Sequence, residues 1–216
     1  MNPFRILKHQ LYLFQLENYE IRRYWKLMRL PRLWRPKAKP RKELVWTLKA
    51  RTLLGLALVL QFLAATLFTE GFVGLVVLFY LFTFVHFVFL ATAAILLWPA
   101  DYFLKKLIIR RAKRKISQFP NLKIIGITGS YGKTTMKEIL AAVLGVKFKA
   151  LKTPDSVNTE VGIGRLIMKE VTPQTEIFIV EMGAYGRYGI KSLCELARPD
   201  IAILTGINEA HLERFG

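Results

Sequence analysis

Two long apolar runs, separated by a single acidic residue, most constrain how this chain can fold. Residues 52–69 and 71–100 contain no Asp, Glu, Lys or Arg, and only Glu70 lies between them. A helix needs roughly 20 apolar residues to cross the hydrocarbon core of a bilayer, so both runs are long enough. Because almost no loop separates them, we predict a transmembrane hairpin of two helices, over about residues 52–69 and 71–98.

The basic residues of the chain lie on both sides of the predicted hairpin. Residues 1–51 carry 14 Lys and Arg against 3 acidic residues, and residues 101–123 carry 8 against 1. Residues 124–216 are nearly neutral, with 11 basic and 10 acidic residues, so the flanks account for the net charge of +18. A nucleic-acid-binding domain concentrates its basic residues on the folded surface, so we expect no nucleic acid partner. The positive-inside rule instead puts both flanks in the cytoplasm, next to membrane lipids.

These patterns divide the chain into four parts. They are a basic N-terminal segment (1–51), the hairpin (52–100), a basic juxtamembrane linker (101–120) and a C-terminal domain (121–216). In the N-terminal segment, aromatic, leucine and basic residues follow a roughly helical rhythm, which fits an amphipathic helix at the membrane surface. A solvated basic tail fits this segment equally well. His86, inside the second apolar run, is interpreted as a neutral helix-packing residue.

The C-terminal domain begins with a strand, a glycine-rich turn and a helix. Residues 123–128 form a short apolar run that predicts a buried strand, and residues 134–145 predict a helix that ends at Gly145. The free N–H groups and the dipole at the start of a helix favour a bound phosphate at such a turn. The predicted nucleotide-binding residues are Gly129, Ser130, Tyr131, Gly132, Lys133, Thr134 and Thr135.

Three side chains of this domain suggest a site for a nucleotide and its metal ion. Lys133 is expected to neutralise phosphates, and the Thr134 hydroxyl is expected to bind Mg²⁺. The turn departs from the strict G-x-x-x-x-G-K-[ST] pattern, because Ile127 stands where that pattern has its first glycine. Glu181 ends a second apolar strand, residues 177–181, and ligands bind at the carboxyl edge of open α/β sheets. We therefore place Glu181 at the Mg²⁺; a carboxylate that caps the next turn is the alternative.

A third apolar strand, over residues 201–205, completes the pattern of strands alternating with helical stretches. This alternation predicts a mostly parallel sheet flanked by helices. The expected fold is therefore an α/β P-loop domain, with an incomplete sheet, preceded by a two-helix transmembrane hairpin.

Four segments of the C-terminal domain carry a more specific signal. They are TGSYGKTT at 128–135, TPDSVNTEVGI at 153–163, IFIVEMGA at 177–184 and PDIAILTGINEAHLERFG at 199–216. In this order they resemble the motifs of the Mur ligase family, the cytoplasmic ATP-dependent amide ligases of peptidoglycan synthesis. The stretch GKTTMKEIL is most similar to the branch that adds D-alanyl-D-alanine. The resemblance covers the chain from residue 122 onward and says nothing about residues 1–120.

The resemblance implies an ATP-dependent carboxylate–amine ligase that uses ATP and Mg²⁺. In this reaction a substrate carboxylate attacks the γ-phosphate of ATP to give an acyl phosphate, and an amine then displaces phosphate. Carried over to this sequence, the catalytic residues are Lys133, Asn158, Glu181 and His211, and the metal ligands are Thr134, Glu181 and His211. The implied substrate is a peptidoglycan precursor peptide, UDP-linked or lipid-linked. The predicted hairpin and its basic flanks add an expected location in the bacterial inner membrane, with the catalytic domain in the cytoplasm.

The sequence also departs from the family pattern. Gly206-Ile207-Asn208 stands where members usually have N-I-G, and Tyr185 and Arg187 lie in a region that commonly holds Asn and His. A basic segment and the hairpin occupy the place of the UDP-sugar-binding domain, and the chain stops before the region of the carbamylated lysine and the C-terminal domain. We therefore expect a truncated middle domain at 121–216, inactive alone, that needs the missing C-terminal part in cis or in trans.

Two other functions are compatible with the pattern of a hairpin followed by a phosphate loop. A membrane-tethered P-loop regulator, such as the bacterial tyrosine kinases, has the same organisation but would be expected to end in a tyrosine cluster. A non-enzymatic binding module derived from a ligase is the other alternative.

Overall fold

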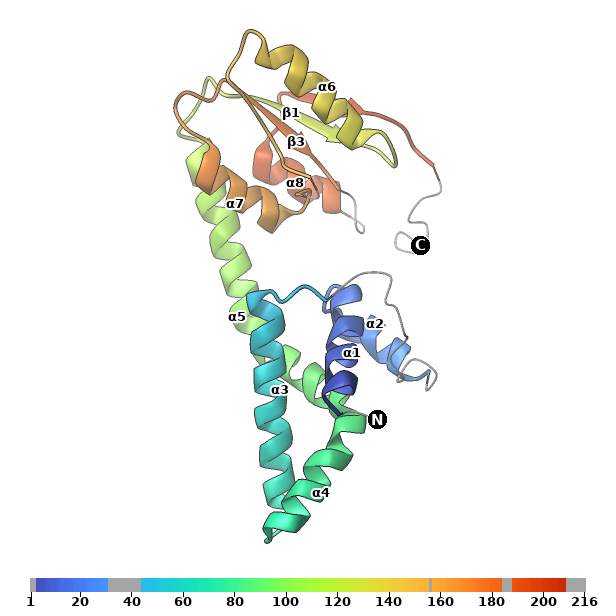
Figure 1. The fold of residues 1–216 in the computed structure, drawn as a ribbon. Coiled ribbons are helices and arrows are strands. Elements are labelled where there is room, and N and C mark those ends of the chain that lie inside the picture. The colour runs from blue at the N-terminus through green and yellow to red at the C-terminus, as the bar shows by residue number, and fades with distance from the viewer. Residues whose placement is uncertain (1–2, 31–43, 156, 184–187, 209–216) are drawn as a thin grey trace. The chain divides into compact units, whose positions relative to one another are not determined.

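The protein divides into two units, residues 1–101 and residues 102–216, and each is described by itself (Figure 1). The boundary between them falls inside one long helix, α5 (His86–Ile116). The structure is a computed structural model, and it describes residues 3–30, 44–155, 157–183 and 188–208.

A pair of apolar helices joined by a short turn dominates the first unit. α3 (Leu48–Leu67) begins at Thr47, whose side chain accepts a hydrogen bond from the Ala50 N–H, and α4 (Phe72–Phe82) follows after the turn at Glu70. Among the described residues, two helical stretches are long and apolar enough to cross a membrane, by length and composition: residues 48–67 and 72–116. Two apolar helical stretches therefore lie where the hairpin was expected, and their insertion in a membrane stays a prediction.

The N-terminal segment forms two short helices rather than one. α1 (Pro3–Leu16) and α2 (Ile21–Met28) are separated at Asn18 and Tyr19, which both have positive φ angles of 53° and 61°. Their apolar faces are buried together with residues of α3 and α5. The buried cluster includes Leu11, Phe14, Tyr24, Met28, Leu53, Ala57 and Leu90. Because these side chains are packed, a solvated tail does not describe the two helices.

The second apolar run is not one continuous α-helix, as residues 71–98 were expected to be. A short 3-10 turn, η2 (Thr83–Val85), separates α4 from α5. The side-chain amide of Gln10 donates to the backbone carbonyls of Thr83 and Phe84, each over 3.4 Å. A carbonyl that loses its regular helical partner in an apolar environment needs another donor. Gln10, which comes from α1, supplies that donor at the break.

A second polar contact inside this unit joins α3 to the helices that follow. The Gln61 amide donates to the carbonyl of Phe79 over 2.9 Å, and the Gln61 side-chain oxygen lies 2.7 Å from Nδ1 of His86. Both Gln61 and His86 are fully buried. His86 therefore packs between helices, in line with its interpretation from the sequence.

Helix α5 runs through most of the segment expected to be a linker, residues 101–120. It contains Pro99 and stays helical as far as Ile116. Ala112 is fully buried in the core of the second unit, and Ile109 packs against the same core. The structure differs from the linker prediction because the basic residues here share a helix with an apolar face. The exposed basic residues of this helix include Arg110, Arg111 and Arg114.

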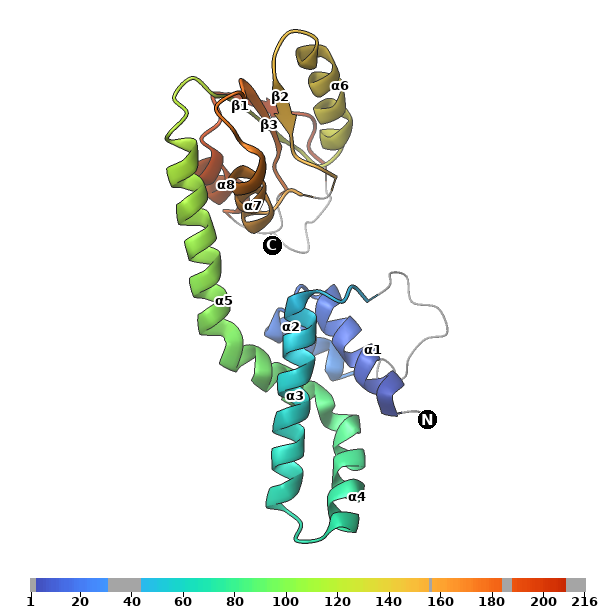
Figure 2. The ribbon, with the colours of Figure 1, turned by 60° about the vertical axis from the view of Figure 1, so that its left-hand side comes forward.

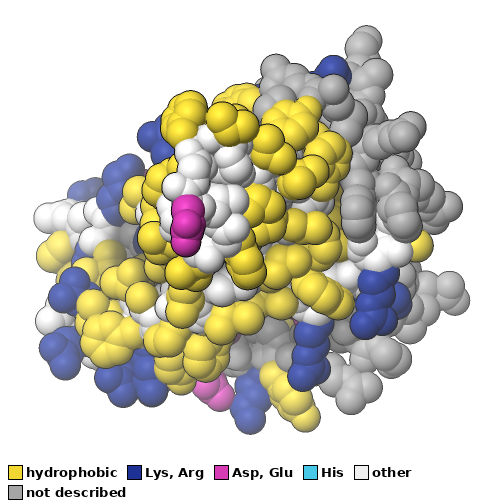
Figure 3. Space-filling model, turned by 90° about the horizontal axis from the view of Figure 1, so that it is seen from below, with side chains coloured by type: hydrophobic (Ala, Val, Ile, Leu, Met, Phe, Trp, Pro, Cys, Tyr) yellow, Lys and Arg dark blue, Asp and Glu magenta, His cyan; other side chains and the backbone are white. Residues whose placement is uncertain are grey.

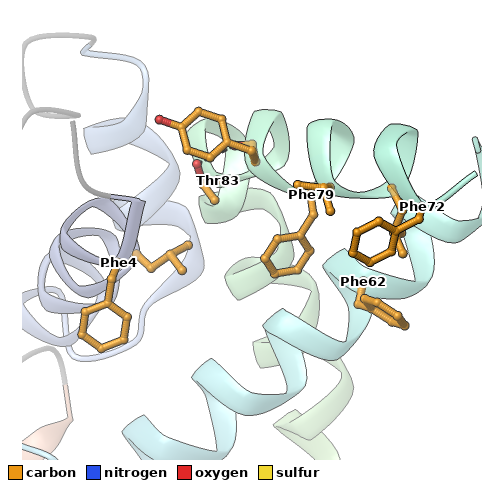
Figure 4. A pocket seen from close by; sticks show the side chains of 9 residues that line it. Phe4, Phe62, Phe72, Phe79 and Thr83 are labelled. Atoms are coloured by element: carbon orange, nitrogen blue, oxygen red, sulfur yellow. Dashed lines mark hydrogen bonds between the residues drawn. The ribbon is translucent and has the colours of Figure 1, made fainter.

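A pocket of about 500 Å³ lies between α1, α3 and α4 in the first unit. Figure 4 shows Phe4 of α1, Phe62 of α3, and Phe72 and Phe79 of α4 around it, with Thr83 at the start of η2. Its lining carries no charged side chain, so it offers nothing to hold the phosphates of a nucleotide. The residues that line it are Phe4, Leu7, Phe62, Phe72, Leu75, Val76, Phe79, Tyr80 and Thr83.

In the second unit, the described residues form a four-stranded parallel sheet in the order β2-β3-β1-β4. Its strands are β1 (Lys123–Thr128), β2 (Ala150–Lys152), β3 (Ile177–Glu181) and β4 (Ile201–Leu204). The predicted parallel sheet and three predicted strands are confirmed. β2 was not predicted, because its three half-buried residues form no apolar run.

Helices cover both faces of this sheet, as Figure 2 shows. α6 (Lys133–Gly145) lies on one face, and α7 (Glu160–Glu170) and α8 (Gly189–Ala197) lie on the other. Successive side chains of a strand point to opposite faces of the sheet, as expected for strands buried on both sides. Ile125, Ile127, Ile177 and Ile179 pack toward α6, whereas Ile124, Phe178 and Val180 pack toward α7 and α8. The loops after β1 and β3 therefore meet at the same carboxyl edge.

Asp200 joins the start of β4 to β1. Its carboxylate accepts hydrogen bonds from the Ile124 N–H over 2.8 Å and from Lys123 Nζ over 3.2 Å. Its own N–H donates to the Ile124 carbonyl over 2.8 Å. The Ile124 N–H, followed by the Lys123 ammonium, lowers the pKa of the Asp200 carboxyl below its ordinary value.

Replacing Asp200 with Asn is expected to lower the free energy of unfolding by about 0.5–1 kcal/mol at pH 7, since the contact is partly exposed. A carboxyl whose folded-state pKa is lowered stabilises the fold above its unfolded pKa of about 3.9 and loses that effect as the pH falls through its folded pKa. Urea unfolding should therefore show a difference in free energy of unfolding between Asp200→Asn and the parent protein that is smaller at pH 3 than at pH 7. Glu195→Gln, an exposed carboxylate of α8, is the control and should change neither midpoint. An equal effect of Asp200→Asn at both pH values would contradict the assignment.

Candidate functional site

The turn between β1 and α6 is built around two glycines with positive φ angles. Gly129 has a φ of 143° and Gly132 a φ of 74°, a region that favours glycine. Gly132 is the residue at which α6 begins. The first backbone N–H groups of α6 are therefore free of helical partners at the carboxyl edge of the sheet, which is the geometry that favours an anion.

The end of β4 braces this turn. The Ser130 N–H donates to the Gly206 carbonyl over 2.7 Å, and the Asn208 N–H donates to Ser130 Oγ over 3.1 Å. The Thr205 hydroxyl lies 2.5 Å from the Tyr131 carbonyl, to which it donates. The segment that departs from the family pattern, residues 206–208, thus contacts the glycine turn directly.

Glycine at position 206 also fits the turn. A Cβ atom at Gly206 would lie 2.5 Å from Cζ of Tyr131, so the Tyr131 ring occupies space that any other residue would fill. The departure at residue 206 and the tyrosine of the turn are therefore structurally linked.

The hydroxyl of Thr134 and the carboxylate of Glu181 are brought together as the sequence predicted. Thr134 Oγ1, in the first turn of α6, donates to Glu181 Oε2, at the end of β3, over 3.0 Å. Glu181 is 5% exposed, and its backbone N–H donates to the buried hydroxyl of Thr153 over 3.0 Å. The helix therefore holds the carboxylate of Glu181, and the loop after β2 holds its backbone.

Lys137 is a member of the site that the sequence analysis missed. It is fully buried, and its Nζ lies 3.3 Å from both Glu181 Oε2 and Asp155 Oδ1. Lys133, Thr134 and Lys137 share an arc of about 100° on α6, because residues four apart lie one above the other. The spacing of Lys137 from Lys133 was the signal available in the sequence.

The structure gives contacts for some of the other predicted site residues and does not describe one of them. Lys133 Nζ donates to the Gly129 carbonyl over 2.6 Å and so lies against its own turn. The Asn158 carbonyl accepts a hydrogen bond from the Gly183 N–H over 3.2 Å, which puts the Asn158 segment beside the end of β3. Thr135 lies exposed in the first turn of α6. His211 lies outside the described residues.

The donor atoms of Thr134 and Glu181 fit Mg²⁺. Within residues 3–30, 44–155, 157–183 and 188–208, no group of three or more His, Cys, Asp or Glu side chains could hold a metal ion. The edge of an octahedron of oxygens about 2.1 Å from Mg²⁺ is about 3.0 Å long. Thr134 Oγ1 and Glu181 Oε2 are 3.0 Å apart, so both can be ligands of one ion. Two protein ligands with water and phosphate oxygens are the usual way in which proteins hold Mg²⁺.

Gly129→Ala is expected to lower the free energy of unfolding by about 2–4 kcal/mol, because it combines backbone strain with a clash. A Cβ atom there would lie 2.2 Å from Thr205 Oγ1 and 2.9 Å from the Gly206 carbonyl oxygen. Gly145→Ala is the matched control, since a Cβ at Gly145 meets nothing within 4 Å. Chemical denaturation of both variants tests the prediction. Equal stabilities of the two variants would show that the turn is not built as described.

Comparison with known proteins gives a consistent match for this domain. Residues 127–216 match the Mur ligase middle domain. The UDP-N-acetylmuramoyl-tripeptide–D-alanyl-D-alanine ligase of Bacillus subtilis (strain 168) is 38% identical over 94 residues, which are 44% of this chain and 20% of that protein. The enzyme of the same name from Synechocystis sp. is 40% identical over 95 residues, 44% of this chain and 21% of that protein.

The solved structures agree with this match. Crystal structure I of MurF from Acinetobacter baumannii superimposes with a TM-score of 0.50 and 28% sequence identity, over 52% of this chain and 24% of that chain. The chain thus spans about a fifth of the length of the curated relatives it matches. Together with the parallel sheet and the glycine turn, these matches support the Mur ligase family, and its MurF branch, for residues 127–216 of this chain.

Proposed function

We propose that the second unit binds ATP with Mg²⁺ and is the ATP-handling part of a MurF-like amide ligase of peptidoglycan precursor synthesis. The observation that carries this proposal is the 3.0 Å contact between Thr134 Oγ1 and Glu181 Oε2, beside a glycine turn at the start of α6. A hydroxyl and a carboxylate so placed supply Mg²⁺ ligands next to free backbone N–H groups that bind phosphate.

Each residue of the site has a distinct role in this proposal. The backbone N–H groups of the turn bind the phosphates of the nucleotide, and Lys133 exchanges its contact with the Gly129 carbonyl for a phosphate oxygen. Thr134 and Glu181 hold Mg²⁺, which when bound offsets the negative charge of the phosphates. Asn158, near the end of β3, and His211 complete the site as the family resemblance implies. Positioning and charge neutralisation of this kind supply most of the catalysis of phosphoryl transfer.

The reaction that we assign follows from the relatives. Their names describe ligation of UDP-N-acetylmuramoyl-tripeptide and D-alanyl-D-alanine. For this chain, we propose activation of the carboxylate of a peptidoglycan precursor peptide, UDP-linked or lipid-linked, as an acyl phosphate that an amine then attacks. The chain matches only about a fifth of those relatives, so the remaining functions of a ligase are assigned to a further part, in cis or in trans.

Lys133→Met and Glu181→Gln are each expected to weaken binding of ATP with Mg²⁺ at least tenfold, because each removes a charge that the phosphates or the metal ion need. Titration of the purified 216-residue chain with a fluorescent ATP analogue measures this. Lys169→Met, on the exposed surface of α7, removes the same charge away from the site and should leave the affinity unchanged. If Lys133→Met and Glu181→Gln bind the analogue like Lys169→Met, the proposed nucleotide site is wrong.

We also propose that the first unit anchors the protein in the bacterial inner membrane, with the second unit in the cytoplasm. Large apolar side chains of α3 and α4 are exposed, whereas a helix in the core of a soluble protein would bury them. Figure 3 shows hydrophobic side chains gathered around the end of the unit where α3 and α4 meet. The exposed side chains include Val59, Phe62, Leu63, Leu67, Phe72, Val73, Val77 and Leu81. The basic residues on both flanks favour cytoplasmic termini.

Cysteine labelling tests this topology, because Cys194 is the single cysteine of the chain. In a Cys194→Ser background, Glu70→Cys should react with a membrane-impermeant maleimide added to intact spheroplasts, since Glu70 lies in the turn between α3 and α4. Lys191→Cys, an exposed position on α8, should react only after the cells are lysed. Labelling of Lys191→Cys in intact spheroplasts would refute the cytoplasmic location.

A further inference from the structure

Lys137 is a fully buried lysine to which neither the family resemblance nor the proposed function gives a role. It lies on the face of α6 that points to the end of β3, one turn after Lys133. A buried ammonium is costly unless it is paired with an opposite charge. The partner of Lys137 therefore indicates what the residue does.

Among the described residues, three carboxylates lie within 4 Å of the Lys137 ammonium, and they differ in exposure. Asp155 and Glu138 side chains are 83% and 45% exposed, at 3.3 Å and 3.7 Å. The Glu181 side chain is 7% exposed, at 3.3 Å. Water screens the first two contacts far more than the third. The main ionic partner of Lys137 is therefore Glu181.

The Lys137 ammonium contacts the same oxygen of Glu181 that faces Thr134. Oε2 lies 3.3 Å from Lys137 Nζ and 3.0 Å from Thr134 Oγ1. A metal ion about 2.1 Å from this oxygen would lie within about 5.4 Å of the ammonium. Repulsion between a divalent and a monovalent cation at this separation corresponds to more than tenfold in affinity, even in a medium as polar as water.

We propose that Lys137 is the resident counter-ion of the Mg²⁺ site, an inference that rests on the proposed function. Its ammonium neutralises Glu181 while no divalent cation is bound, and its repulsion keeps the affinity of the domain for free Mg²⁺ low. Phosphate oxygens of the nucleotide add the negative charge that offsets this repulsion. Metal and nucleotide are therefore bound together, and the domain does not hold a metal ion alone. Lys137 acts as a positioning residue through Glu181.

Binding of Mn²⁺ in the absence of nucleotide, followed by electron paramagnetic resonance, tests this role on the full chain in detergent. Mn²⁺ is the probe because it takes the same oxygen ligands as Mg²⁺. Lys137→Met removes the charge and keeps most of the length of the side chain, and we expect it to bind Mn²⁺ at least tenfold more tightly than the parent protein. Lys137→Arg keeps the charge and should bind as weakly as the parent. Lys169→Met is the control for the same charge change at a distant exposed site.

A second neutral variant and a second measurement cover the case in which Lys137→Met is poorly folded. Lys137→Gln is neutral but still donates hydrogen bonds to the carboxylates, and it should also bind Mn²⁺ more tightly. Added Mn²⁺ should raise the thermal unfolding temperature of both neutral variants more than that of the parent protein, because a ligand stabilises the state that it binds.

The outcomes separate this inference from the proposed function. If Glu181→Gln abolishes Mn²⁺ binding in the Lys137→Gln background, but Lys137→Gln alone binds like the parent, the metal site stands and the counter-ion role is wrong. If Glu181→Gln changes Mn²⁺ binding in neither background, the metal site itself is wrong and both proposals fall. Tighter binding by the neutral variants that depends on Glu181 supports both.

Discussion

The buried carboxylate of Glu181 is the interaction on which the arrangement of the site depends. A carboxylate that is 5% exposed must find hydrogen-bond donors and opposite charge within the protein. It finds them in Thr134 and Lys137 of α6, while the hydroxyl of Thr153 holds its backbone N–H. One helix, one strand and the loop after β2 thus meet at a single group. These contacts and the apolar packing of α6 on the sheet together orient α6. The orientation of α6 in turn positions the glycine turn that precedes it.

The sequence predicted this unit well where the signal was local. The apolar runs before the glycine turn and before Glu181 define β1 and β3, and the helical stretch between Lys133 and Gly145 defines α6. What it did not predict depends on tertiary contacts. β2 is too short and too exposed to show a pattern, and Lys137 acquires its role only when β3 brings Glu181 to its helix face. Residues 102–116 are strongly basic and were therefore predicted to be a linker, although one face of this helix is apolar and packs on the core.

The first unit shows the same limit of local information. Residues 83–85 are as apolar as their neighbours, and nothing in that stretch indicates a change from α to 3-10 geometry. The donor that satisfies the carbonyls there is Gln10, 73 residues earlier in the chain. The pairing of Gln61 with His86 is likewise invisible until the helices pack. Amide side chains inside an apolar unit are expensive unless they form hydrogen bonds. Here Gln10 donates to two backbone carbonyls, and Gln61 bonds to one backbone carbonyl and to His86.

The brace between the glycine turn and the end of β4 has a mechanical consequence. Ser130 and Tyr131 share hydrogen bonds with Thr205, Gly206 and Asn208, so the two segments move together or lose those bonds. A phosphate that draws the turn toward itself therefore also pulls on the polypeptide that leaves the sheet after β4. The turn and the strand end are thus mechanically coupled. If a nucleotide binds at this turn, as we propose, a shift of the turn reaches the strand end through one backbone hydrogen bond and through the side chains of Ser130 and Thr205.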